Sequence, residues 1–216
     1  MNVLALDGAL GAFSTAVACD GQIVATRCEA GTSALERGLA LVDAVLAEAR
    51  LEPQRLDRLA TGIGPGGFTG LRIAIAYAKS LAAVWERPLV ALRSFDLLEF
   101  GGRFERVLTV IVGRPGVISA RYRSGAQMRR ASGRISEVLD ALSPFIEGGA
   151  LDVVGAPKDV LDALAEREVI VHSFDPAVAP AAASAALAAS SRAPAKSVHE
   201  VRADYGELPA AKPPRF

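Results

Sequence analysis

The chain has 216 residues, of which 51% are hydrophobic, and its 24 basic and 24 acidic residues cancel. This length and composition allow one or two sizeable buried cores, which excludes a disordered protein. Because the net charge is zero, no global field draws the chain to nucleic acid or to an anionic membrane, so any RNA contact is expected to be local or indirect.

The first residues, MNVLALDGAL, have no basic segment before their apolar run and reach an aspartate at position 7. They are therefore expected to be neither a signal peptide nor a membrane anchor. No later stretch stays apolar and uncharged for the roughly 20 residues that a membrane span needs. We expect a cytoplasmic protein without a membrane partner.

Three strands are expected before any helix. Residues 2–7 form an apolar run that is typical of a buried strand. A hairpin over residues 13–29 supplies two more, because Asp20-Gly21 is the signature of a two-residue turn.

The hairpin also separates the two cysteines. In the register set by the turn, Cys28 lies opposite Phe13. Cys19 lies beside the turn, roughly 20 Å away at about 3.3 Å per residue. A disulfide between them is therefore excluded.

An amphipathic helix of about four turns follows the hairpin. Ser33 and Glu36 have the spacing of a capping box, and Pro53 closes the segment. The apolar residues at helical spacing between them are Leu35, Leu39, Val42, Leu46 and Ala49.

The rest of the chain predicts two related halves. A strand at 58–64, a helix from Gly70 to Trp85 and a strand at 88–92 complete a β-β-β-α-β-α-β order. A looser version follows, with strands near 107–112, 117–123, 152–155 and 169–171 and helices near 136–146 and 157–167.

We place a subdomain boundary near residue 102. The first subdomain is then 1–102, and the second is 103–216. An Ala-rich helix ending before Pro194 and a Pro-rich tail are assigned to the second. The last ten residues are expected to be poorly ordered.

The stretch GIGPGGFTGLRIAIAYAK, residues 62–79, admits several interpretations. A strand, a glycine-rich loop and a helix N-terminus can bind an anion. Gly62, Gly64 and Gly67 match a dinucleotide-binding pattern, but Pro65 removes an N–H and the next strand ends without the acid that would hold a ribose. A phosphate-binding P-loop fails, because Phe68 stands where the lysine must be.

Packing is the interpretation that the residues alone favour for this loop. Glycines let the chain turn sharply and bring the helix close to the sheet, with Thr69 as the predicted N-cap. Arg72 and Lys79 lie two turns apart on one helix face, and the flanks carry little bulk. The small residues on these flanks are Ala74, Ala76, Ala78, Ala82 and Ala83.

Catalytic groups are sparse. His172 and His199 are 27 residues apart and predict neither a metal site nor a catalytic triad. Asp7 closes the first strand, where an actin-like ATPase would hold magnesium, although a turn-forming aspartate is an equal alternative. The other carboxylates offer no acid–base pair: Asp57, Asp96, Asp140, Asp152 and Asp159.

The motif GIGPGGFTGLRIAIAYAKSLA closely resembles the TsaB (YeaZ) family signature, and residues 2–29, the helix from Ser33 and ERPLVALRSFDLL fit the same family in order. The first half of the chain fits well and the second half only in outline. The resemblance implies an α/β fold of the ASKHA (actin-like, RNase H-like) class, with two related β-β-β-α-β-α-β-type subdomains and mixed sheets.

The resemblance also implies a function. Such proteins are non-catalytic subunits in the synthesis of N6-threonylcarbamoyladenosine in tRNA, where they bind the catalytic TsaD subunit, with TsaE as the third subunit. No cofactor is implied, and tRNA contact is expected to be indirect. The family's dimer surface uses the two helices of the first subdomain, and a homodimer through the same helices is an alternative.

Several residues of this chain match positions of the family's motif and of its expected interface. The motif positions are Gly64, Pro65, Gly66, Phe68, Thr69, Gly70, Leu71 and Arg72, with Ala78 on the expected packing face. Their expected partners on the first helix are Leu35, Leu39, Val42 and Leu46.

The chain departs from the family at several places. Asp7-Gly8-Ala9 replaces a usual Asp-Thr-Ser, so two hydroxyls that favour phosphate are missing. VGRPGV, residues 112–117, keeps only Arg114 and Gly116 of a longer family turn, and RADYGELP lacks a clear Tyr-Leu-Arg. The segment before the first helix keeps only Glu36.

Two alternatives remain open from the residues. Asp7 and the glycine-rich loop suit an independent ASKHA-type ATPase or phosphotransferase, and the three spaced glycines suit a dinucleotide-binding oxidoreductase. A local basic patch could still reach tRNA, formed by Arg121, Arg123, Arg129, Arg130 and Arg134.

Overall fold

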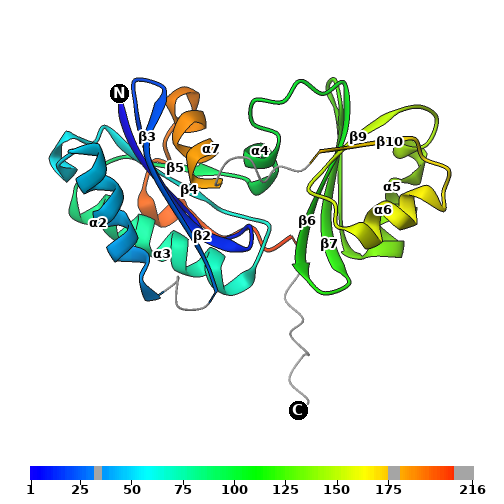
Figure 1. Cartoon of the computed structure of the whole chain (residues 1–216), viewed down its shortest axis with the longest axis horizontal. Helices are drawn as coiled ribbons and strands as arrows, with labels where there is room; N and C mark the ends of the chain where they lie inside the picture. The colour runs from blue at the N-terminus through cyan, green and yellow to red at the C-terminus, as the bar shows by residue number, and fades with distance from the viewer. Residues whose placement is uncertain (32–35, 175–180, 207–216) are drawn as a thin grey trace, which may run out of the picture.

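The computed structural model describes residues 1–31, 36–174 and 181–206. It contains two five-stranded mixed sheets, one formed by the first half of the chain and one by the second, with helices around each (Figure 1). The first sheet has the order β3-β2-β1-β4-β5. Its strands are β1 (Asn2–Asp7), β2 (Ala12–Cys19), β3 (Gln22–Ala30), β4 (Arg58–Gly62) and β5 (Leu89–Leu92).

The second sheet repeats this topology, with the order β10-β9-β6-β7-β8. In both sheets an antiparallel three-stranded meander is extended by two parallel strands. The repeat confirms the predicted pair of related α/β units. The strands are β6 (Arg106–Arg114), β7 (Val117–Ser124), β8 (Gln127–Arg134), β9 (Leu151–Val154) and β10 (Val171–Phe174).

Helices α2 (Gly38–Ala49) and α3 (Phe68–Val84) cover one face of the first sheet. Apolar side chains that alternate along β1 and β2, among them Leu4, Leu6 and Phe13, pack against these helices. In the second unit, α5 (Ile135–Ile146) and α6 (Lys158–Ala165) pack on the sheet in the same way.

The Ala-rich helix corrects the predicted domain assignment. Helix α7 (Ala181–Ala188) packs on the other face of the first sheet, against Val3, Ala5 and Val90, and not with the second unit. Small side chains on both partners let the helix backbone approach the strands closely, and Arg58 Nη1 donates a hydrogen bond of 2.9 Å to the Ala189 carbonyl. The strands change sheet between Leu92 and Arg106, an interval that contains the predicted boundary near residue 102.

The first hairpin has the predicted Asp20-Gly21 turn, but its register slips by one residue. Val17 pairs with Ala25 and Ala18 with Ile23, so one extra residue forms a bulge. Cys28 therefore lies opposite Ser14 and not opposite Phe13. Both cysteines are free, as expected.

Two other local predictions need correction. Strand β8 was missed, because QMRRASGR is exposed and carries arginines in place of an apolar alternation. Helix α3 begins at Phe68 with Gly67 as the N-cap, so Thr69 lies inside the helix and caps nothing.

Some predictions fall outside the described residues. These are the capping serine, Ser33, its neighbour Leu35 and the order of the last ten residues. Within the described ranges, no helix is long and apolar enough to cross a membrane.

Candidate functional site

The glycine-rich loop packs tightly against the turn between β1 and β2. The Gly67 N–H donates a hydrogen bond of 2.7 Å to the Ala9 carbonyl. A Cβ at Gly66 would lie 2.2 Å from the same oxygen, and a Cβ at Gly70 would lie 2.1 Å from the Gly8 carbonyl oxygen. Because backbone meets backbone here, the glycines serve close packing and one loop N–H is already used.

Asp7 lies in this contact and is fully buried. Its Oδ1 accepts hydrogen bonds from the N–H groups of Ala9 (3.0 Å) and Leu10 (3.4 Å), which makes it the turn-forming aspartate of the sequence analysis. Its Oδ2 is buried and has no hydrogen-bond partner among the residues that the structure describes, and a Cβ at Gly62 would lie only 1.8 Å from it. The carboxylate therefore faces the protein interior.

Burial raises the pKa of Asp7 to about 6, while the N–H groups of Ala9 and Leu10 act in the opposite direction. A raised carboxyl pKa adds stability at low pH that is lost as the pH rises from the unfolded value of 3.8 to about 6. Between pH 4.5 and 7.5 this loss is about 2 kcal/mol.

We expect Asp7→Asn to remove this loss, because asparagine keeps the Oδ1 acceptor and does not ionise. The free energies of unfolding of both proteins, measured by urea denaturation at pH 4.5 and 7.5, should diverge by about 2 kcal/mol in favour of the variant at the higher pH. Parallel pH profiles would show that Asp7 is ionised in the folded protein across this range.

The other candidate catalytic groups have structural partners. Asp96 pairs with Arg121, Asp140 pairs with Arg167 and Asp57 accepts a hydrogen bond from the Asn2 N–H. Asp152 lies 3.6 Å from Nδ1 of the exposed His172. No group of three or more potential metal-ligating side chains exists among the residues that the structure describes.

The predicted interface residues divide into two sets. Val42, Leu46, Leu71 and Ala78 are buried in the core beneath α2 and α3, so they cannot contact a partner while this unit is folded. This corrects the assignment of Ala78 to a packing face between subunits. The exposed members are Leu39, Phe68, Thr69 and Arg72, whereas Gly64 and Pro65 are buried and Gly66 and Gly70 are partly buried in the loop contact.

A surface along α3 combines two of these exposed residues, Phe68 and Arg72, with the C-terminal segment. Phe68 is 56% exposed and its ring centroid lies 5.2 Å from that of Tyr205, while the Arg72 guanidinium lies 5.0 Å from the Phe68 centroid. Beside them is a hollow of about 370 Å³. We call this surface the α3 face, and its residues are Phe68, Arg72, Ala76, Lys79, Ser80 and Tyr205.

Sequence reasoning missed the part that the C-terminal segment plays in the α3 face. Val201 is buried in the first core, Lys79 Nζ donates a hydrogen bond of 3.3 Å to its carbonyl, and the Asp204 N–H donates one of 2.7 Å to the Ile63 carbonyl. Val198 and Val201 are the branched apolar residues just before RADYGELP, and two residues are too few to establish a periodicity.

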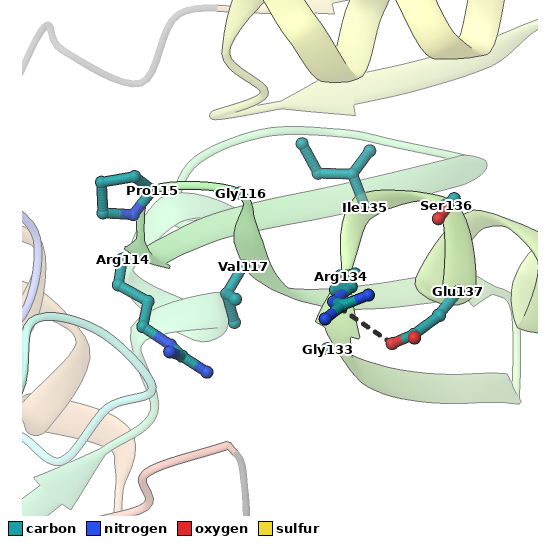
Figure 2. A pocket seen from close by; sticks show the side chains of 9 residues that line it. All are labelled: Arg114, Pro115, Gly116, Val117, Gly133, Arg134, Ile135, Ser136 and Glu137. Atoms are coloured by element: carbon teal, nitrogen blue, oxygen red, sulfur yellow. Dashed lines mark hydrogen bonds between the residues drawn. The ribbon is translucent and has the colours of Figure 1, made fainter.

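A second hollow, of about 670 Å³, lies in the second unit at the turn between β6 and β7. Figure 2 shows Arg114 at the end of β6 and Arg134 just before α5 among the side chains that line the hollow, with Glu137 beside Arg134. The Arg134 N–H donates a hydrogen bond of 3.3 Å to Glu137 Oε2, so a carboxylate already occupies the start of the helix.

The predicted basic patch is divided in the structure. Arg121 is buried and pairs with Asp96 and Glu99, and Arg123 also pairs with Glu99. Arg129 stacks over Phe145. Two carboxylates therefore neutralise the centre of the patch.

Comparison with solved structures defines the fold. YeaZ from Pseudomonas aeruginosa superposes with a TM-score of 0.73 at 23% identity, over 94% of this chain and 99% of that one. A ROK hexokinase from Thermus thermophilus matches the fold with a TM-score of 0.50 at 14% identity, over 87% of this chain and 97% of that one. The fold is that of an actin-like, ASKHA-class protein, as the resemblance implied.

The sequence comparison identifies the family. The model of the TsaD family, tRNA N6-adenosine threonylcarbamoyltransferase, matches residues 29–201. The chain therefore belongs to the TsaD family, and within it the relatives that it resembles are TsaB (YeaZ) proteins.

Several curated relatives are named as TsaB. The tRNA threonylcarbamoyladenosine biosynthesis protein TsaB of Escherichia coli is 32% identical over 55% of this chain and 53% of its own length. TsaB of Bacillus subtilis is 34% identical over 31% of this chain and 29% of its own length. The matches span about half or less of the length of these relatives.

Proposed function

We propose that the chain is a non-catalytic subunit in the biosynthesis of N6-threonylcarbamoyladenosine in tRNA. It acts in the cytoplasm by binding a TsaD-like catalytic subunit, with a TsaE-like ATPase as a further component and tRNA contacted indirectly. The names of the TsaB relatives and the family match support the pathway. The packing of the glycine-rich loop against Gly8 and Ala9 supports a structural role for this loop, because the Gly67 N–H is already bonded to the Ala9 carbonyl.

The α3 face is the proposed partner surface. It offers an exposed aromatic pair, Phe68 and Tyr205, beside two basic side chains, Arg72 and Lys79. Aromatic and arginine side chains of this kind dominate the energetics of protein interfaces. An alternative use of the same face is a homodimer, which mass measurement of the isolated chain distinguishes from a heterodimer.

Phe68→Asp is expected to weaken binding of the TsaD from the same organism at least about 30-fold, because losing an interface aromatic costs about 2 kcal/mol or more. Calorimetry gives the affinity, and size-exclusion chromatography with light scattering gives the mass of the complex. The matched control is Ile170→Asp, which changes another exposed apolar side chain, 63% exposed, on the second unit.

Two results would contradict the proposal. An unchanged affinity in Phe68→Asp would remove the α3 face as the partner surface. Magnesium-dependent ATP turnover by the purified chain that is lost in Asp7→Asn would instead support an independent ATPase.

A further inference from the structure

A cavity of about 180 Å³ lies where the two units meet. Its walls come from the glycine-rich loop, helix α4 (Ser94–Leu98), strand β8 and the C-terminal segment. At roughly 30 Å³ per water molecule, it has room for about six waters or one small solute. The side chains and backbone that line it include Pro65, Phe95, Arg130, Ser132, Asp204 and Gly206.

Arg130 is the cation in this cavity, and its hydrogen-bonding capacity is unused. Its nearest carboxylate oxygen, Oδ2 of Asp204, lies 3.9 Å from Nη1, beyond hydrogen-bond distance. None of its five N–H groups makes a hydrogen bond with a residue in the described ranges. Its guanidinium stacks 5.4 Å from the Phe95 ring centroid, and Arg121 lies 5.0 Å from the same centroid.

The surrounding charge is positive. Five guanidinium groups and three carboxylates gather at this junction, which leaves a surplus of two positive charges: Arg93, Arg121, Arg123, Arg130 and Arg192 against Asp96, Glu99 and Asp204. Asp96 and Glu99 are engaged by Arg121, Arg123 and Arg192. Desolvation, and then the charges of Arg93 and Arg121, lower the pKa of Arg130.

A bound oxyanion would offset this surplus of positive charge. A guanidinium with free N–H groups binds phosphate or carboxylate oxygens through two parallel hydrogen bonds. The Ser132 hydroxyl, which donates a hydrogen bond of 2.9 Å to Ser119 Oγ, adds a polar group to the same wall. Asp204 forms only a long ion pair with Arg130, 3.9 Å between Oδ2 and Nη1. Its Oδ1 accepts a hydrogen bond of 3.1 Å from the Gly206 N–H.

We propose that this cavity binds a small oxyanion, the size of inorganic phosphate or a short carboxylate, with Arg130 as its main ligand. Asp204 is the internal counter-ion, and the bound anion competes with it for the guanidinium. The site is separate from the α3 face and does not depend on the proposed function.

Calorimetric titration of the full chain with sodium phosphate, and in a second arm with sodium acetate, tests the site at constant ionic strength. Saturable binding is expected in at least one arm. Arg130→Gln should weaken it at least tenfold, and Asp204→Asn should strengthen it several-fold, because the competing carboxylate is gone. The two arms show whether phosphate or carboxylate is the preferred chemistry.

Arg129→Gln is the matched control. It removes the same charge from the neighbouring position of β8, but Arg129 stacks over Phe145 and does not line the cavity. Thermal unfolding of each variant establishes that it is folded. The proposal is overturned if neither anion binds wild type or Asp204→Asn, if Asp204→Asn binds no more tightly than wild type, or if Arg129→Gln weakens binding as much as Arg130→Gln.

Discussion

Gly70→Ala is expected to destabilise the protein by about 3 kcal/mol or more, at or above the upper end of the usual cost of overpacking, or to prevent folding. Helix propensity alone predicts the opposite, because alanine within a helix is favoured over glycine by about 1 kcal/mol. Residue 70 lies in α3, but its Cβ would meet the Gly8 carbonyl oxygen at 2.1 Å. Because the contact is between two backbone segments, no flexible side chain can move away to make room for the methyl group.

Gly67→Ala is the control for this prediction. Gly67 has a φ of −59° that any residue adopts, and a Cβ there would have the Ala9 oxygen at 3.7 Å, an ordinary contact. Urea denaturation should place this variant within about 1 kcal/mol of wild type, because the only expected loss is the poorer N-cap preference of alanine at the start of α3. If both variants are equally stable, the close approach of α3 to the β1–β2 turn does not exist in solution.

Glu99→Ala is expected to cost about 3–5 kcal/mol, because it leaves a buried guanidinium without its main counter-charge. The Glu99 side chain is 7% exposed and that of Arg121 is 6% exposed. Glu99 accepts hydrogen bonds from Arg121 Nε (3.1 Å), Arg123 Nε (3.0 Å) and the Thr109 hydroxyl. These bonds join the end of α4 to β6 and β7, so the loss also loosens the contact between the units.

Asp162→Ala provides the comparison. The Lys158–Asp162 pair is exposed, with side chains 86% and 58% accessible, and such pairs contribute under about 1 kcal/mol. The difference between the two variants in the free energy of unfolding is the quantity to measure. Equal losses would mean that water reaches the Glu99 carboxylate and screens it as it screens a surface pair.

The fold was predictable where local patterns were strong. The apolar run of β1 and the Asp20-Gly21 turn lie where the sequence predicts them. Strand β8 was missed because it has arginines where an apolar alternation is expected. Two of these arginines stack on aromatic rings, Arg129 on Phe145 and Arg130 on Phe95. The bulge in the first hairpin was missed because the extra residue does not change the residue types of the strand in a recognisable way.

The candidate site was predictable only in part. The glycine motif located the loop, but alanines do not reveal which helix face is buried, so Ala78 was assigned to a surface when it lies in the core. The contributions of Asp204 and Tyr205 arise from a segment about 140 residues after the loop, and such long-range contacts leave no local periodicity.

The return of α7 to the first sheet also determines when that sheet can be completed during synthesis. Val3, Ala5 and Val90 emerge from the ribosome early, yet the helix that covers them begins at Ala181. Until that helix has been made, one apolar face of the first sheet remains uncovered while the second unit already has all its strands. A helix translated after the strands of both sheets therefore completes the fold of the first unit.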